Sequence, residues 1–212
     1  MIDVRSLTVQ YGDKKVFSDI TFNVAEGELV LVKGDNGSGK STLCYALSGI
    51  IPRNIDAQIM GSVYLDGKDI DSLTQAELTK TVGIVIQNPD NMLFSPSVED
   101  ELAFAPENLC LKRDEIEERV ESAIKLTNIH SLRYISPDKL SGGEKQRVAI
   151  ASVLTLDPKI IIFDEVLSCL DKENLQIIID LIRKLKQMNK TIIMVEHNSL
   201  LNFYDKTIDL NL

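Results

Sequence analysis

Gly34-Asp35-Asn36-Gly37-Ser38-Gly39-Lys40-Ser41 is the stretch around which this chain is organised. It fits the pattern G-x-x-x-x-G-K-[ST] of a phosphate-binding loop. The apolar residues 29–32 before it are typical of a buried strand, and the spacing of apolar residues over 43–47 predicts a helix after it. Glycines let backbone N–H groups turn toward phosphate oxygens, and the helix N-terminus adds positive potential. The stretch therefore predicts a phosphate site in which Lys40 reaches the outer phosphates and Ser41 binds Mg²⁺.

The composition indicates a globular chain of one domain with room for an inserted lobe. The chain has 212 residues, of which 44% are hydrophobic and 26% charged. Its 32 Asp and Glu against 23 Lys and Arg give a net charge of −9, so we expect no nucleic-acid partner. The three cysteines form no C-x-x-C pair, which argues against a zinc site or a disulfide framework. We find no apolar signal region and no apolar run long enough to cross a bilayer, which favours a cytosolic protein.

The first 24 residues predict strands before the loop, which is unusual for a simple doubly wound sheet. Residues 4–9 and 16–24 have strand patterns, separated by a turn at 11–15. They predict an extra antiparallel layer. Tyr11 can stack on a nucleotide base, or it can be an ordinary edge-strand aromatic, and the residues alone favour neither.

Polar side chains follow three predicted buried strands. Gln87 follows residues 81–86, Asp164 and Glu165 follow residues 160–163, and His197 follows shortly after residues 191–195. Open α/β sheets bind ligands at the carboxyl ends of their strands. Two adjacent carboxylates are costly in a core but suit a site beside Mg²⁺ and water.

Residues 88–157 predict helices and no strand. The segment 88–96 holds two prolines and predicts irregular structure, after which Ser95 or Ser97 can open a helix. An amphipathic helix is expected from Asp114 and an apolar one over 148–156. Before the last helix, Ser141-Gly142-Gly143-Glu144 has the spacing of a capping box. Its glycine pair suits the approach of backbone to an anion better than capping alone.

With these residues in order, the chain resembles the ATP-binding subunits of ABC transporters over essentially its full length. The matching elements are Tyr11, the loop 34–42, Gln87, the signature Leu140-Ser141-Gly142-Gly143-Glu144, the strand 160–164 with Glu165, and His197. The resemblance implies an α/β fold: a P-loop NTPase (RecA-like) core with an N-terminal antiparallel β layer and an inserted α-helical subdomain over about 88–157. It also implies a single ATP-binding domain over 1–212.

The resemblance also implies roles for particular residues in ATP hydrolysis. Tyr11 would stack on adenine, and the phosphates would bind Asp35, Asn36, Gly37, Ser38, Gly39, Lys40, Ser41 and Thr42. Mg²⁺ would be held by Ser41, Gln87 and Asp164. Glu165 would be the general base and His197 would contact the γ-phosphate, with Gln87 and Lys40 completing the catalytic set. Ser141, Gly142, Gly143 and Glu144 would close over ATP bound to a second chain, with Asp171 at the dimer interface.

A closer resemblance is to the ATPases of energy-coupling-factor transporters, carried by residues 83–91 and 104–109. It implies an importer of vitamins or of cobalt and nickel, with an integral membrane coupling subunit and a second ATPase that is identical or paralogous. The chain would lie in the cytoplasm on the inner face of the cell membrane. Met92, Leu93 and Phe94 would then line a docking groove, unless they pack locally.

Two features depart from the family pattern. Cys169 stands where alanine is more common, and a small residue is kept. The sequence also stops soon after His197, whereas many such subunits continue well past this point, so a dimer built by a C-terminal extension is not indicated.

The alternative is a non-transport ABC ATPase of DNA repair or translation. The insertion is short and has no sustained heptads, and the charge is acidic, all of which disfavour it. A regulatory module without turnover is disfavoured by Glu165 and His197, and a small-molecule kinase by residues 140–144. The transported substrate is not indicated.

Overall fold

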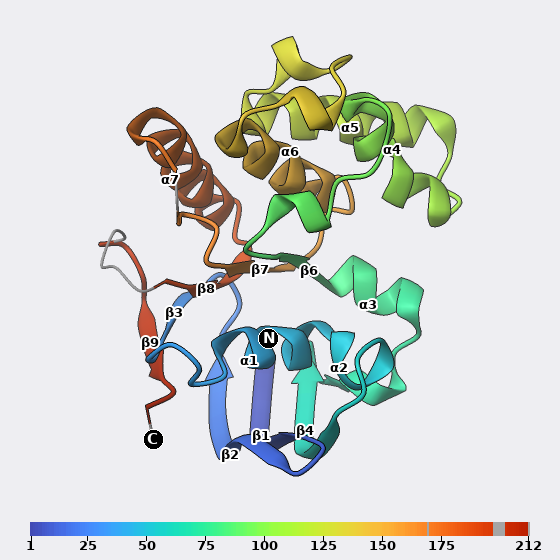
Figure 1. The fold of residues 1–212 in the computed structure, drawn as a ribbon. Coiled ribbons are helices and arrows are strands. Elements are labelled where there is room, and N and C mark those ends of the chain that lie inside the picture. Colours follow the sequence, from blue (N-terminus) through green and yellow to red (C-terminus); the bar gives the residue numbers. More distant parts are fainter. Residues whose placement is uncertain (169, 197–201, 212) are drawn as a thin grey trace. The chain divides into compact units, whose positions relative to one another are not determined.

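The computed structural model describes residues 1–168, 170–196 and 202–211 (Figure 1). The chain divides into two compact units. The first holds Met1–Ile84, Lys159–Glu165 and Lys186–Leu212, and the second holds Val85–Pro158 and Val166–Leu185. The second unit thus contains the range 88–157 expected as a helical subdomain, together with a later segment.

The first unit contains the predicted antiparallel layer. Its sheet has the order β2-β1-β4-β5, formed by β1 (Ile2–Tyr11), β2 (Lys14–Val24), β4 (Gln58–Leu65) and β5 (Lys68–Asp69). Strand β1 pairs antiparallel with both β2 and β4, and Tyr11 lies opposite Lys14 at the hairpin end. The alternation of apolar residues in β1 and β2 produces this layer, because it places Ile2, Val4 and Val24 on one buried face.

The second sheet of the chain has the order β6-β7-β8-β3-β9. Its strands are β3 (Leu29–Lys33), β6 (Val82–Val85), β7 (Ile160–Asp164), β8 (Thr191–Val195) and β9 (Lys206–Asp209). Strand β3 pairs in parallel with β8 and β9, and β7 pairs in parallel with β8. Strands β7 and β8 are buried at every residue, as expected for near-continuous apolar runs in a parallel sheet.

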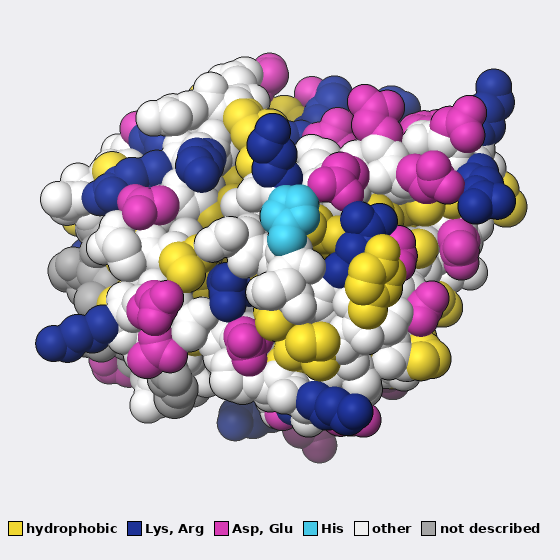
Figure 2. Space-filling model, turned by 90° about the horizontal axis from the view of Figure 1, so that it is seen from above, with side chains coloured by type: hydrophobic (Ala, Val, Ile, Leu, Met, Phe, Trp, Pro, Cys, Tyr) yellow, Lys and Arg dark blue, Asp and Glu magenta, His cyan; other side chains and the backbone are white. Residues whose placement is uncertain are grey.

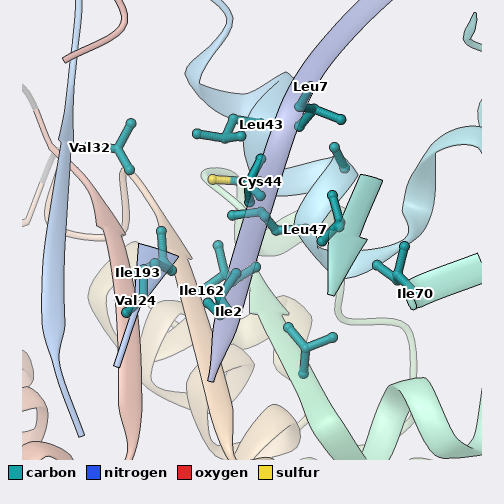
Figure 3. Packing of buried hydrophobic residues seen from close by; sticks show 14 of the residues in the cluster. Ile2, Leu7, Val24, Val32, Leu43, Cys44, Leu47, Ile70, Ile162 and Ile193 are labelled. Carbon is teal, nitrogen blue, oxygen red and sulfur yellow. The ribbon is translucent and has the colours of Figure 1, made fainter. Parts of the chain in front are cut away.

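Helix α1 (Lys40–Ser48) lies in the core of the first unit. Its Leu43, Cys44 and Leu47 pack in one cluster with residues of both sheets, such as Ile2 and Ile162 (Figure 3). The short helices α2 (Ile50–Arg53) and α3 (Gln75–Thr81) follow it in the chain. The start of α1, which carries the phosphate loop, is therefore fixed from two sides by apolar packing.

The second unit is helical, as expected. It contains α4 (Val98–Asn108), α5 (Arg113–Thr127) and α6 (Gly142–Leu154), and most of α7 (Lys172–Gln187). It also contains the 3₁₀ turns η2 (Pro89–Asn91), η3 (His130–Leu132) and η4 (Pro137–Lys139), whereas η1 (Ile70–Ser72) belongs to the first unit. Helices α4, α5 and α6 share an apolar core whose members include Leu102, Ile124 and Val148.

Two local predictions differ from the structure. The segment 88–96 was expected to be irregular, but it contains η2, because the Asn88 side chain accepts the Asp90 N–H (3.0 Å) and Pro89 starts the turn. The helix expected over 148–156 begins at Gly142, since the Ser141 cap outweighs the low helix propensity of two glycines.

No helix among the described residues is long and apolar enough to cross a bilayer. On the face visible in Figure 2, Asp and Glu side chains are interspersed with Lys and Arg and with small apolar groups.

Candidate functional site

The phosphate loop joins β3 to α1 as the sequence predicts. Gly37 and Gly39 have φ of 84° and 97°, in the left-handed region that favours glycine. A Cβ on Gly39 would lie 2.6 Å from Val16 Cγ1 and 2.9 Å from a Phe17 ring carbon, so β2 closes against the loop. Glycine at position 39 is thus required by both backbone angle and space.

Lys40 is held in the loop by backbone carbonyls. Its Nζ donates to the carbonyl oxygens of Gly34 and Asp35, both at 2.9 Å, and the residue is only 5% exposed. A buried ammonium group without a counter-ion is costly unless it is hydrogen-bonded. The loop therefore keeps a positive charge in place for an anionic ligand.

A pocket of about 390 Å³ opens beside the loop within the first unit. It brings Tyr11 together with residues of the loop and with Glu165, as expected for a nucleotide site. Its lining residues are Tyr11, Lys14, Lys15, Val16, Asn36, Gly37, Gly39, Lys40, Ser41, Thr42 and Glu165. Three lysines against one carboxylate give this pocket a positive charge that suits phosphates.

Two loop residues in the expected phosphate-binding set do not line this pocket. The Asp35 N–H donates to Asn211 Oδ1 (2.8 Å), and Ser38 Oγ is buried without a hydrogen-bond partner among the residues described. Lys14 and Lys15, in contrast, line the pocket although the sequence reading placed them in a turn. The pairing of Tyr11 with Lys14 brings them there, because strand β2 begins at Lys14.

Asp164 and Glu165 lie at the end of β7. Asp164 is 2% exposed, and burial raises its pKa, with a hydrogen bond to Ser41 opposing the shift. Its Oδ1 is buried and has no hydrogen-bond partner within the described part of the chain. Glu165 has φ of 53°, a strained value for a side chain of this size, and its N–H donates to the Val195 carbonyl (3.1 Å).

These residues fit a hard cation. An orphaned buried carboxylate oxygen near a serine hydroxyl is the kind of donor set that Mg²⁺ takes together with phosphate oxygens. Within the ranges described, no group of three or more His, Cys, Asp or Glu side chains is arranged to hold a metal ion by itself.

The signature residues lie in the second unit, at the start of α6. Ser141 and Glu144 form the predicted capping box: Glu144 Oε2 accepts the Ser141 N–H (2.8 Å) and Oγ (2.7 Å). These hydrogen bonds lower the pKa of Glu144, so its carboxylate stays ionised. The first turn of α6 is therefore rigid.

The two signature glycines have different surroundings. A Cβ on Gly142 would meet nothing within 4 Å, whereas a Cβ on Gly143 would lie 2.4 Å from Asn174 Cγ. Asn174 itself donates its N–H and its Nδ2 to Asp171, at 2.8 and 2.7 Å, and these hydrogen bonds lower the pKa of Asp171. Packing within the unit therefore explains why position 143 is glycine, but it does not explain the glycine at position 142.

Gln87 also belongs to the second unit, where it shares a hollow of about 460 Å³ with Gly142 and Lys145. The structure thus brings Gln87 and the signature together in one unit, and Tyr11, the phosphate loop and Glu165 together in the other. His197 lies outside the described residues.

Phe94, left open between docking and local packing, protrudes from the second unit. The residue is 66% exposed, and its ring meets the ring of Phe104 of α4 edge to face, with ring centroids 4.7 Å apart. The buried Glu101 holds the loop by accepting the N–H groups of Phe94 and Ser95, both at 2.9 Å. Local packing accounts for the loop but not for the exposed ring.

Known proteins resemble this chain along most of its length. A family model described as ABC transporter matches residues 17–168. A putative ABC transporter ATP-binding protein of Pyrococcus abyssi is 44% identical over 202 residues, which are 94% of this chain and 72% of that protein. The energy-coupling factor transporter ATP-binding protein EcfA1 of Fusobacterium nucleatum is 39% identical over 93% of this chain and 74% of its own length. Among eight of the curated relatives that match, the chain spans from 33% to 76% of the relative's length.

Two solved structures share the fold. One is cbiO1 from Clostridium perfringens, described as part of the ABC transporter complex cbiONQ, with a TM-score of 0.80, 36% identity, and coverage of 93% of this chain and 78% of its own. The other is the ATP-binding cassette MJ0796 in a dimer bound to ADP and Pi, with a TM-score of 0.83, 26% identity, and coverage of 99% and 94%. The P-loop NTPase fold expected from the sequence is thereby confirmed.

Proposed function

This chain belongs to the ABC transporter family and is an ATP-binding, ATP-hydrolysing domain, and we propose that it powers an importer of the energy-coupling-factor type. The observation that carries the ATPase part is the pocket that joins Tyr11, the phosphate loop and Glu165. The importer part rests on the likeness to EcfA1 and to cbiO1. The whole chain would form the single ATP-binding domain predicted over 1–212.

We assign roles to the polar groups of the pocket and of the phosphate loop beside it. Tyr11 stacks on adenine, and loop residues 35–42 bind the phosphates, with the Lys40 ammonium on the β- and γ-oxygens. Ser41 and the free Oδ1 of Asp164 would hold Mg²⁺, directly or through water. The ion, when bound, supplies charge stabilisation for phosphoryl transfer.

Glu165 is the proposed general base. Its strained backbone at the end of β7 holds the carboxylate at the pocket, where it can accept a proton from an attacking water. Gln87 would complete the site by contacting Mg²⁺, and His197 would contact the γ-phosphate.

The signature would serve ATP bound to a second copy or a paralogue of this chain. The open space at Gly142 supports this role, because no atom within 4 Å of a Cβ there would block the approach of an anion to the start of α6. Ser141, Gly143 and Glu144 would shape that turn, and Asp171 would lie at the interface of the two chains.

A groove of about 520 Å³ between α4 and α5 is the proposed docking site for an integral membrane subunit. It is lined by four apolar residues, four carboxylates and two guanidinium groups: Ala103, Leu111, Ile116, Val120, Glu99, Asp100, Glu107, Glu117, Arg113 and Arg133. Both guanidinium groups already pair with carboxylates of the second unit, Arg133 with Glu99 (2.8 Å) and Arg113 with Glu117 (3.0 Å). Cytoplasmic loops of membrane proteins carry an excess of Lys and Arg, so a short basic amphipathic segment fits this groove.

The proposed assembly works on the inner face of the cell membrane, where ATP closes the two ATPase chains and hydrolysis opens them. Its cargo would be a vitamin or a transition-metal ion. The non-transport alternative, a repair or translation ATPase, would need no basic membrane segment in the groove.

The test is purification of the tagged chain from detergent-solubilised native membranes, followed by mass spectrometry. We expect a multi-spanning subunit to co-purify, with or without a second ATPase. Glu107→Arg, in the lining of the groove, should lose this subunit, and Glu118→Arg, an exposed residue of α5 outside the groove, should keep it. Recovery of ribosomal or repair proteins alone would contradict the importer.

A further inference from the structure

An ion pair connects the segment that carries Gln87 to the helix that carries the signature. Lys145 Nζ of α6 lies 2.6 Å from Asp90 Oδ1 of η2, although the two residues are 55 positions apart in the chain. The Lys145 side chain is only 19% exposed, while that of Asp90 is 61% exposed. Both line the hollow that also holds Gln87 and Gly142.

Each end of this ion pair belongs to a locally rigid element. On one side, Asn88 Oδ1 accepts the Asp90 N–H (3.0 Å) and the Pro89 carbonyl accepts the Met92 N–H (2.9 Å). On the other side, the Lys145 N–H donates to the Ser141 carbonyl (2.9 Å), one turn after the capping box. A displacement of Asp90 therefore moves the whole turn, and a displacement of Lys145 moves the signature end of α6.

The neighbouring residue secures the same face of α6. Gln146 lines the hollow and is only 4% exposed, so this face of the helix is packed rather than free to rotate. Since long side chains on a mobile surface gain little from pairing, the partly buried Lys145 makes a better-defined contact than an ordinary surface pair.

We propose that the Lys145–Asp90 ion pair makes the Gln87 segment and the signature move as one body, so that Asp90 and Lys145 are positioning residues for hydrolysis. Gln87 would act on ATP bound to its own chain and the signature on ATP bound to the second chain. The pair thus links the two ATP sites of the dimer, and a displacement of the loop that holds Asp90 affects both. This inference rests on the proposed roles of Gln87 and the signature.

The test compares kcat and KM for MgATP in the purified full chain and its variants. Asp90→Asn and Lys145→Met each remove the pair and should lower kcat about fivefold, the effect expected for losing an ion pair of this exposure. KM should stay within about twofold, because Tyr11 and the loop 34–42 are untouched. Lys145→Arg, and the exchange Asp90→Lys with Lys145→Asp, should restore kcat.

Lys159→Met is the matched control. It breaks a pair of the same length, Lys159 Nζ to Asp66 Oδ2 at 2.6 Å, inside the first unit and outside the nucleotide pocket. It should leave kcat unchanged. Melting temperatures of all variants should agree within a few degrees.

Wild-type kcat in both single variants would overturn the inference. A loss that charge exchange does not restore, in a variant that melts like the parent, would overturn it as well. If the unmodified chain turns over ATP no faster than its Glu165→Gln variant, the proposed function is contradicted and not the role of the ion pair. This comparison therefore distinguishes a failure of the inference from a failure of the proposed function.

Discussion

Replacing each signature glycine by alanine separates the contribution of that glycine to folding of this chain from its proposed role in binding ATP of a second chain. Both glycines lie in the first turn of α6, so both gain the same local preference for alanine. They differ only in what a new Cβ would meet: open space at Gly142, and the Asn174 side chain at Gly143.

The magnitudes follow from these surroundings. Alanine is favoured over glycine by up to about 1 kcal/mol in a helix, and nothing within 4 Å opposes it at position 142. For a domain of this size, Gly142→Ala should therefore raise the melting temperature by about 2–4 °C. Gly143→Ala should melt below Gly142→Ala, because its Cβ, 2.4 Å from Asn174 Nδ2, displaces the side chain that binds Asp171.

The assay pairs thermal melts of the nucleotide-free chain with steady-state ATP turnover. We expect Gly142→Ala to be more stable than the parent yet to turn over ATP about a hundredfold more slowly, the usual cost of spoiling one donor to a phosphate or oxyanion. A stabilised Gly142→Ala variant with parental turnover would refute the role of this glycine in trans. A melting temperature of Gly142→Ala below that of the parent would show that glycine at position 142 is required for folding of the chain itself.

Two further predictions concern the nucleotide pocket. Lys40→Met should weaken ATP binding about 10- to 100-fold in calorimetry, since it removes charge-assisted hydrogen bonds from a nearly buried ammonium, while Lys15→Met, at the pocket lining, should change affinity only about threefold or less. Asp164→Asn should raise the melting temperature of the nucleotide-free chain at pH 7. It should also abolish the further rise in melting temperature that Mg²⁺ causes when it is added together with ATP. Burial raises the Asp164 pKa, so ionisation of this carboxyl group destabilises the folded chain at a pH above the ordinary carboxyl pKa. The stability advantage of the asparagine variant should therefore vanish as the pH falls through the raised pKa toward the ordinary value. An advantage that is unchanged at low pH would contradict this reading of Asp164.

The local structure around the phosphate loop was largely predictable, because a phosphate-binding loop requires a strand before it and a helix after it. The pattern from Gly34 to Ser41 works only between a strand and a helix N-terminus, and the structure has β3 and α1 there. The capping box of Ser141 and Glu144 was equally readable, since both partners lie within one turn.

Contacts between distant segments were not predictable. Lys14 and Lys15 reach the pocket through the register of β1 with β2, which includes several irregularities that no local pattern specifies. Asn174 under Gly143 and Asp90 beside Lys145 are brought together by helix packing. Helix α7 is amphipathic and has a buried face, but nothing in its local sequence indicates that most of this helix belongs to the second unit.

ATP turnover and ATP binding by Glu165→Gln, measured beside the unmodified chain with Mg²⁺ present, test the central claim most directly. The substitution removes the proposed base and keeps the shape of the side chain. We predict unchanged ATP affinity and turnover lowered by at least about a hundredfold. Parental turnover in this variant would contradict the catalytic site assigned here.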